Sequence, residues 1–371
     1  MKPSKQDDEV IITDADAKDE SGGLYPYDPT EEDIDIREAP HTVFELMRKY
    51  DQGKLIINPD FQRNLVWEPE QKSRFIESII LNFPLPSFYV NQTREGKYII
   101  VDGLQRTSTL HEFVKDEFEL TGLEALPKLN GYHFSKLTKL AGDYETRIED
   151  KKLSLYVIKP SVPIQVVYDI FNRINTGGTI LNRQEVRNCI FIGKASQLLK
   201  ELSEQDYFRK AIDNGISPKR MKDREAVLRY LAFKIFDYKI DYHGDMSGFV
   251  EKAMRKINLM AEPEREELKA DFKRVMTLTF EFFAQTNFRL PSNQSGGKIN
   301  IAILESVCYF FSVKSDSFLK KNKGTIQSNF DKLLKNQHYL EAVRFTTSNR
   351  NYVINRFKLA QEILGEGCEA C

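Results

Sequence analysis

The chain has 371 residues, of which 41% are hydrophobic and 29% are charged, so it carries enough apolar material for a core, and two packed units are expected. No stretch approaches the roughly 18 apolar residues that a membrane span requires, and no apolar signal segment stands at the N-terminus, which predicts a cytoplasmic protein without membrane contact. Four scattered cysteines exclude a disulfide framework and predict reduced thiols.

The net charge of −1 conceals an asymmetry along the chain. Residues 1–40 hold 13 acidic and 4 basic residues, whereas the remainder holds 50 basic and 42 acidic residues. A mildly basic body suits contact with a polyanion such as DNA, although an ordinary solvated surface would have the same balance. Residues 1–38 are acidic and poor in large apolar side chains, which predicts a flexible tail.

Folded structure is expected to begin at Thr42. Thr42 and Glu45 have the spacing of a capping box, which predicts a helix to about residue 49. A short strand is expected over residues 55–57, and residues 58–63 form an irregular loop.

Pro69 is expected in the first turn of the next helix, where apolar residues recur at helical spacing. Residues 87–92 and 97–101 alternate like two strands of a hairpin. The second strand leads directly into a helix over residues 104–115. A further strand is expected over residues 153–158.

A helix over about residues 164–173 precedes a Gly-rich loop, after which Asn182 and Glu185 repeat the capping-box spacing. From about residue 195 onward only helices are expected, for example at residues 225–236, 248–259, 264–283, 300–311 and 352–364. The sequence therefore predicts a mixed α+β domain over residues 39–192 and an all-helical domain over residues 193–371.

The strongest candidate site is Asp102-Gly-Leu-Gln-Arg106, where a buried strand meets a helix. Unpaired N–H groups and the helix dipole favour an anion at such a helix start. Gly103 allows a ligand near the backbone, Arg106 can fork onto two phosphate oxygens, and Asp102 can hold Mg²⁺ or orient a water. In the structural alternative, Asp102 caps its helix and Arg106 pairs with a surface carboxylate.

Two further polar segments stand where elements end. In residues 59–63, Arg63 is expected at the loop end, either available to a ligand or paired with Glu68 or Glu70. Residues 171–179 combine Asn, Arg, Thr and Gly at a helix end, which is typical of an anion-binding nest. A glycine C-cap between two helices is the alternative there.

Several site patterns are absent from the sequence: a G-x-x-x-x-G-K-[ST] phosphate loop, H-E-x-x-H and a paired C-x-x-C zinc set. Cys368 and Cys371 form a single pair, which cannot close a tetrahedral zinc site. Asp60 with Glu95 and Lys97 matches a permissive nuclease pattern, but Glu95 and Lys97 fall in the expected hairpin turn.

Three segments, in this order, resemble the N-terminal domain family of GmrSD-type restriction endonucleases. The family carries F-Q-R-x-x-V/W, D-G-Q-Q-R-x-x-T-L and F-x-R-I-N-T-G-G. The matching segments here are Phe61-Gln-Arg-Asn-Leu-Val-Trp67, Asp102-Gly-Leu-Gln-Arg-Thr-Ser-Thr-Leu110 and Phe171-Asn-Arg-Ile-Asn-Thr-Gly-Gly178. The resemblance covers about residues 40–190 and implies a ParB/sulfiredoxin-like fold for the N-terminal domain.

The resemblance also implies an NTPase that uses Mg²⁺ or Mn²⁺ and is linked to DNA restriction in anti-phage defence. It implies that Asp102, Gln105 and Arg106 are catalytic and that Asp102 also binds the metal. The nucleotide-binding residues that it implies are Arg63, Gly103, Thr107, Asn172, Arg173, Asn175, Thr176 and Gly177.

Two departures from the family pattern bear on function. Leu104 replaces the first Gln of the second motif, which removes an amide donor and can weaken hydrolysis while sparing binding. The second half of the chain has no His-Asn-His nuclease set, so any cutting of DNA is expected from a partner nuclease subunit. The oligomeric state is left open.

Three functions are compatible with the sequence. We favour an NTP-hydrolysing module of a restriction-like system that acts on DNA. The second is a non-catalytic ParB-like regulator that binds nucleotide or DNA, which the presence of Leu104 favours. The third is a DNA nickase that uses Asp60, Glu95 and Asp102 around a metal.

Overall fold

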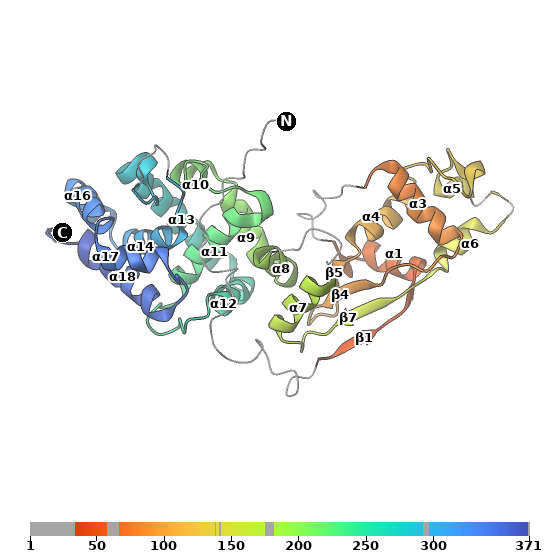
Figure 1. Ribbon diagram of the computed structural model, residues 1–371, viewed down its shortest axis with the longest axis horizontal. Coiled ribbons are helices and arrows are strands. Elements are labelled where there is room, and N and C mark those ends of the chain that lie inside the picture. The colour runs from red at the N-terminus through yellow and green to blue at the C-terminus, as the bar shows by residue number, and fades with distance from the viewer. Residues whose placement is uncertain are drawn as a thin grey trace. The chain divides into compact units, whose positions relative to one another are not determined.

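The computed structural model describes residues 34–57, 67–137, 139–140, 142–174, 182–291 and 297–369. Contacts divide the chain into two compact units, one within Gly22–Leu181 and one within Asn182–Cys371. The first unit mixes helices and strands and the second is built of helices (Figure 1). The predicted fold class, mixed α+β followed by a helical region, is confirmed at this level.

A five-stranded mixed sheet in the order β1-β7-β4-β5-β3 forms the centre of the first unit. The β1–β7 and β4–β5 pairs are antiparallel, and the β4–β7 and β3–β5 pairs are parallel. A separate two-stranded ladder joins β2 to β6. The strand bounds are β1 Ile36–Glu38, β2 His41–Thr42, β3 Leu55–Ile56, β4 Phe88–Gln92, β5 Tyr98–Asp102, β6 Lys152–Leu153 and β7 Leu155–Ile158.

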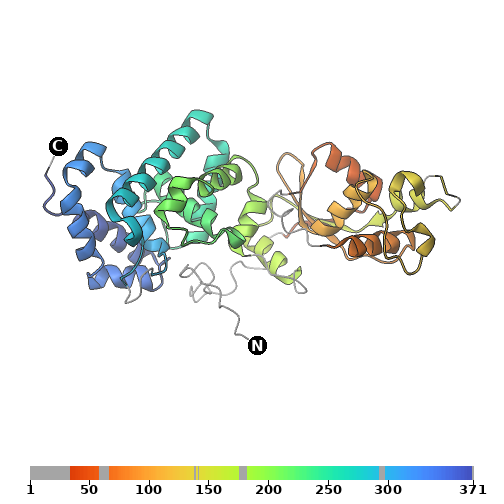
Figure 2. The ribbon, with the colours of Figure 1, turned by 90° about the horizontal axis from the view of Figure 1, so that it is seen from above.

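Three helices cover one face of the sheet: α1 (Val43–Asp51), α3 (Pro69–Ile80) and α4 (Leu104–Val114) (Figures 1 and 2). Strand side chains alternate between the two faces, so Phe88 and Val90 of β4 enter the core beneath these helices. Helix α7 (Ile164–Ile174) contacts β5 as well.

Both predicted capping boxes are present. The Glu45 N–H donates to Thr42 Oγ1 over 3.2 Å, and the Thr42 N–H donates to Glu45 Oε2 over 3.0 Å. The same reciprocal bonds join Asn182 and Glu185 at the start of α8 (Arg183–Ile190), at 2.7 and 2.8 Å. Pro69 stands in the first turn of α3, as predicted.

The structure corrects two sequence predictions. The strand expected over residues 153–158 is two strands, because the chain changes partner at Ser154, from β2 to β1 and β4. The flexible tail was expected to reach residue 38, but Ile36–Glu38 is an edge strand paired with β7. A three-residue strand carries too little apolar pattern to stand out within an acidic segment.

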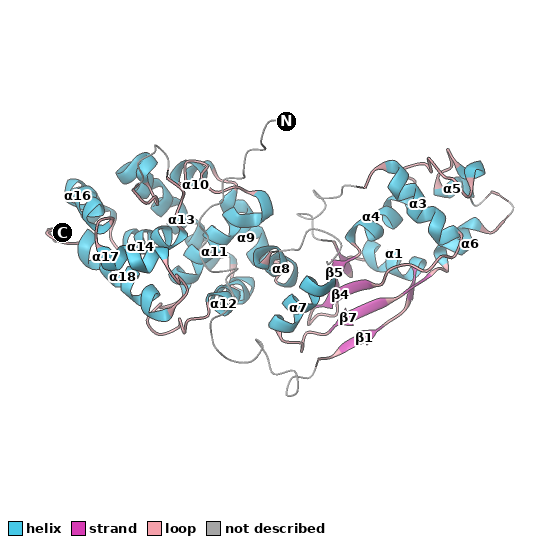
Figure 3. Cartoon of the chain, viewed as in Figure 1, coloured by secondary structure: helices cyan, strands magenta, loops and turns pink. Residues whose placement is uncertain are grey.

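Short elements between α4 and β6 were not predicted. They are a 3-10 turn at Pro127–Leu129, α5 (Phe134–Leu137) and α6 (Tyr144–Glu149). The helical character expected of the second unit is observed (Figure 3). The bounds of its helices after α8 are α9 Lys194–Ser203, α10 Asp206–Ala211, α11 Lys222–Ile235, α12 Met246–Leu259, α13 Glu262–Phe283, α14 Ile301–Ser312, α15 Asp316–Lys321, α16 Lys323–Leu333, α17 Gln337–Arg344 and α18 Arg350–Leu364. The five helices with predicted ranges, α11, α12, α13, α14 and α18, agree with them to within a few residues.

Among the described residues, every helix is too short or too polar to cross a bilayer. Cys189 and Cys308 are buried free thiols, and Cys368 is a partly exposed one.

Candidate functional site

The second motif lies where β5 ends and α4 begins, as predicted. Gly103 separates the two elements with φ +96° and is the N-cap residue of α4. This left-handed conformation favours glycine. A Cβ at position 103 would also come within 2.5 Å of the Phe88 ring, so glycine is needed for packing as well as for the turn.

We predict that Gly103→Ala lowers the free energy of unfolding of the first unit by about 2–3 kcal/mol, from backbone strain and the clash with Phe88. Gly96→Ala is the matched control, because Gly96 also has positive φ but a Cβ there would meet no atom within 4 Å. Chemical denaturation of both variants measures the difference. Equal losses would mean that Phe88 moves aside at no cost.

Arg106 is buried at this junction, with 9% of its surface exposed. Its Nη1 donates to the carbonyl of Pro86, and its Nη2 donates to the Ser87 carbonyl over 3.1 Å and to Asp102 Oδ2 over 2.8 Å. The guanidinium also lies over the Phe88 ring, 4.3 Å from its centroid. Arg106 therefore joins the segment before β4 to the end of β5.

The sequence predicted that Arg106 donates to two phosphate oxygens. In the structure its guanidinium donates to acceptors of the protein itself. Burial lowers the pKa of Arg106, and attraction to Asp102 acts in the opposite direction. The structural alternative is wrong in one part, because Gly103 and not Asp102 is the N-cap of α4. Its other part is close to the observed geometry, since Arg106 does pair with a carboxylate, that of Asp102.

The Asp102 side chain is partly exposed to solvent although it is paired with Arg106. Its side chain is 30% exposed, against 11% for Arg106. A register shift in the β4–β5 ladder places Asp102 opposite Tyr89, although Val90 pairs with Ile100. Such bulges re-aim a side chain at the end of a strand.

A stacked pair of tyrosines, of which Tyr89 is opposite Asp102, was not foreseen from the sequence. The rings of Tyr89 and Tyr156 stack with centroids 5.2 Å apart, because these residues are neighbours in the parallel β4–β7 pair. Burial raises the pKa of Tyr89, and Tyr156 and Asp102 raise it further. Alternation along residues 87–92 implied that Tyr89 faces away from Phe88, but the partner strand was not predictable.

The remaining predicted residues of the second motif differ in accessibility. Thr107 is fully buried and its hydroxyl donates to the Gly103 carbonyl over 2.9 Å, so this hydroxyl is used inside the helix. Gln105 is half-buried in the first turn of α4. Leu104 packs against the apolar cluster beneath the helices.

The first and third motifs fall mostly outside the described residues. This holds for Arg63, Asn175, Thr176 and Gly177, and for the side chain of Asn172. Arg173 is exposed at the end of α7, and its Nε lies 2.9 Å from Asp169 Oδ2. The structure therefore brings together Asp102, Gly103 and Arg106, and the predicted convergence of three loops stays a prediction.

The arrangement bears on the nickase hypothesis. Glu95 precedes β5 in the hairpin turn and Asp102 ends that strand, so the two lie at least roughly 13 Å apart. They cannot share one metal ion. In the described part of the chain, no group of three or more His, Cys, Asp and Glu side chains is placed to hold a metal. Asp60 lies outside the described residues.

Comparison with known proteins agrees with the three motifs. Residues 43–192 match the family model described as GmrSD restriction endonuclease, N-terminal domain. No curated protein matches the chain. The matched segment, residues 43–192, contains all three ordered motifs, so the family match that they predicted is found.

Proposed function

We propose that this chain is the NTP-hydrolysing module of a restriction-like, anti-phage system that acts on DNA, with cleavage performed by a separate nuclease subunit. The proposal rests chiefly on Asp102, an accessible carboxylate that a buried arginine holds beside a glycine at the start of a helix. The domain family supports the connection to restriction.

The α4 N-terminus is the proposed phosphate-binding element. The first N–H groups of a helix have no intrahelical acceptor, and the dipole adds partial positive charge there. Arg63, Asn172, Arg173, Asn175, Thr176 and Gly177 would complete the phosphate cage. Thr107 is omitted, because its hydroxyl is already bonded to Gly103.

Asp102 is the proposed contact to a divalent cation. Mg²⁺ usually keeps several waters and takes one or two carboxylates together with substrate phosphates, so a single accessible carboxylate fits this role. When bound, Mg²⁺ (or Mn²⁺) would neutralise charge on the phosphates.

Arg106 and Gln105 have different proposed roles. Arg106 is a positioning residue, because its donors hold Asp102 and the carbonyls of Pro86 and Ser87. Gln105, half-buried in the first turn of α4, is proposed to orient the attacking water. The partly buried Leu104 side chain packs against the apolar cluster.

The direct test is release of inorganic phosphate from each of the four common NTPs by the purified chain. Activity is measured with Mg²⁺ and with EDTA, and with and without modified DNA. We expect turnover that needs the cation and that DNA stimulates. Absence of phosphate release with all four NTPs, under every condition, would remove the proposal.

A non-catalytic regulator is the second candidate function. The removal of an amide donor by Leu104 favours it, and calorimetry that detects tight NTP binding without phosphate release would establish it. A ParB/sulfiredoxin-like fold is compatible with the small mixed sheet covered by helices on one face, and it remains part of this proposal.

A further inference from the structure

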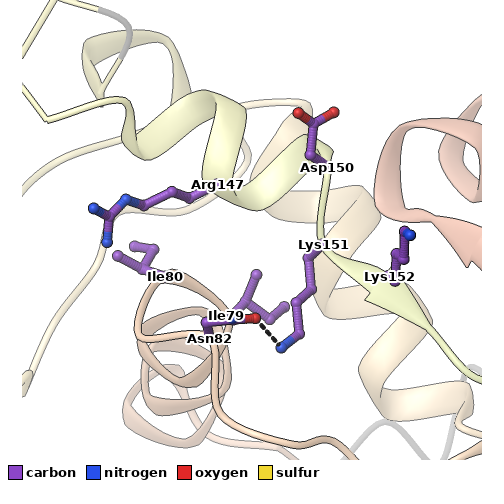
Figure 4. Close-up of a pocket in the computed structure, with 7 residues that line it drawn as sticks. All are labelled: Ile79, Ile80, Asn82, Arg147, Asp150, Lys151 and Lys152. Carbon is purple, nitrogen blue, oxygen red and sulfur yellow. Dashed lines mark hydrogen bonds between the residues drawn. The ribbon is translucent and has the colours of Figure 1, made fainter.

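The first unit contains a pocket that the three motifs do not include. It has a volume of about 450 Å³ and lies between the end of α3 and the segment that joins α6 to β6 (Figure 4). Two isoleucines of α3 form its apolar part. Its polar lining consists of Asn82, Arg147, Asp150, Lys151 and Lys152.

The pocket lining is predominantly basic, with three cationic side chains and one carboxylate. Lys151 is held in place, because its Nζ donates to Asn82 Oδ1 over 2.7 Å and to the Phe83 carbonyl over 2.8 Å. Asn82 follows α3 with φ +57°, which turns its amide toward this lysine. Burial lowers the pKa of Lys151.

Arg147 and Lys152 lie on either side of Lys151 (Figure 4). Both are exposed, and within the described ranges neither forms an ion pair. Two unneutralised cations next to a fixed ammonium make a surface suited to phosphodiester groups.

Two exposed aromatic side chains belong to residues that bind Lys151 through the backbone or follow such a residue. Phe83, whose carbonyl binds Lys151, is 54% exposed. Phe44 is 52% exposed and follows Val43, whose N–H donates to the Lys151 carbonyl over 3.0 Å. An exposed phenylalanine offers a face on which an unpaired base can stack.

We propose that this basic pocket, with Phe44 and Phe83, binds single-stranded DNA. Arg147, Lys151 and Lys152 contact the phosphodiester backbone, and the two phenylalanines stack against unpaired bases. The inference deepens the proposed function, in which DNA is the partner, by assigning the surface that holds it. The pocket and the Asp102 junction use no residue in common.

Fluorescence anisotropy with a labelled single-stranded oligonucleotide, without nucleotide, tests the proposal on the full chain. The Arg147→Ala/Lys152→Ala variant is expected to bind the oligonucleotide about 10-fold more weakly. Its plot of log K against log[salt] is expected to have a slope shallower by about 1.4, because each of the two lost phosphate contacts contributes about 0.7 to the slope for a single strand. Lys136→Ala/Lys139→Ala removes equal charge from exposed positions outside the pocket and is expected to bind like the wild type.

The phenylalanines are tested separately. Phe44→Ala and Phe83→Ala are each expected to lower affinity about 5-fold or more while leaving the salt slope unchanged, because stacking involves no counterion release. A duplex of the same sequence is expected to bind more weakly than the single strand.

Three results would overturn the inference: no binding of DNA by the wild type, equal effects of the pocket and control variants, or a preference for duplex that the phenylalanine variants do not change. NTP turnover without DNA is expected to be unaffected in the pocket variant. DNA binding without turnover would preserve this inference while removing the proposed hydrolysis.

Discussion

The Asp102→Asn variant is expected to release phosphate from its NTP substrate at least about 100-fold more slowly than the wild type. The amide has the same shape and can still accept the hydrogen bond from Arg106, so the junction is preserved. It lacks the negative charge needed to bind a cation or to polarise a water. Steady-state phosphate release at saturating Mg²⁺ measures the effect.

Glu117→Gln is the control for Asp102→Asn, because it makes the same change at an exposed position just beyond α4. It is expected to keep the wild-type rate. Thermal unfolding of Glu117→Gln should match the wild type, whereas Asp102→Asn should fold but unfold at a somewhat lower temperature, because the buried Arg106 loses its counter-charge. A fully active Asp102→Asn protein would exclude Asp102 from catalysis and from metal binding.

The Arg106→Ala variant is expected to lose about 2–4 kcal/mol of unfolding free energy, because two carbonyls and a partly buried carboxylate lose their donor. Arg74→Ala is the matched control: Arg74 also binds a carboxylate, that of Glu124 at 2.8 Å, but the pair is exposed. Exposed pairs contribute about 0–1 kcal/mol. Urea denaturation compares the two variants.

Kinetics of Arg106→Lys separate positioning from direct phosphate contact. The lysine keeps the charge but lacks the planar fork that joins three acceptors. If Arg106 positions Asp102, kcat is expected to fall while the KM for NTP changes little. A rise in KM at unchanged kcat would instead place Arg106 on the phosphates, as the sequence alone suggested.

The element boundaries that the sequence predicted well are those set by neighbouring residues. The capping boxes at Thr42 and Asn182 depend on hydrogen bonds between residues three apart, and Pro69 acts through its own ring. The hairpin of β4 and β5 needs only alternation around a short turn. Such interactions are complete within a few residues, so the local sequence contains them.

The position of the candidate site was predictable from the sequence, but the hydrogen-bond partners of its residues were not. The strand, glycine and helix at residues 98–114 followed from the sequence. The acceptors of Arg106 did not, because Pro86 and Ser87 lie 20 and 19 residues away. Their approach depends on the pairing of β4 with β5.

The basic pocket depends even more strongly on contacts between residues that are far apart in the chain. Asn82 and Lys151 are 69 residues apart and meet only because α3 packs beside α6. No spacing rule connects them, so the sequence contained no sign of this pocket.

By itself, the sequence predicted the family match of residues 43–192, the mixed and helical halves, and the place of the Asp102 motif at a helix start. Ordered motifs and local hydrogen bonding suffice for these. Tertiary structure alone decided that Arg106 is buried on protein acceptors, that Tyr89 faces Asp102, and that residues 36–38 join the sheet. Each of these depends on strand pairing, which selects partners by packing over the whole domain and leaves no local pattern.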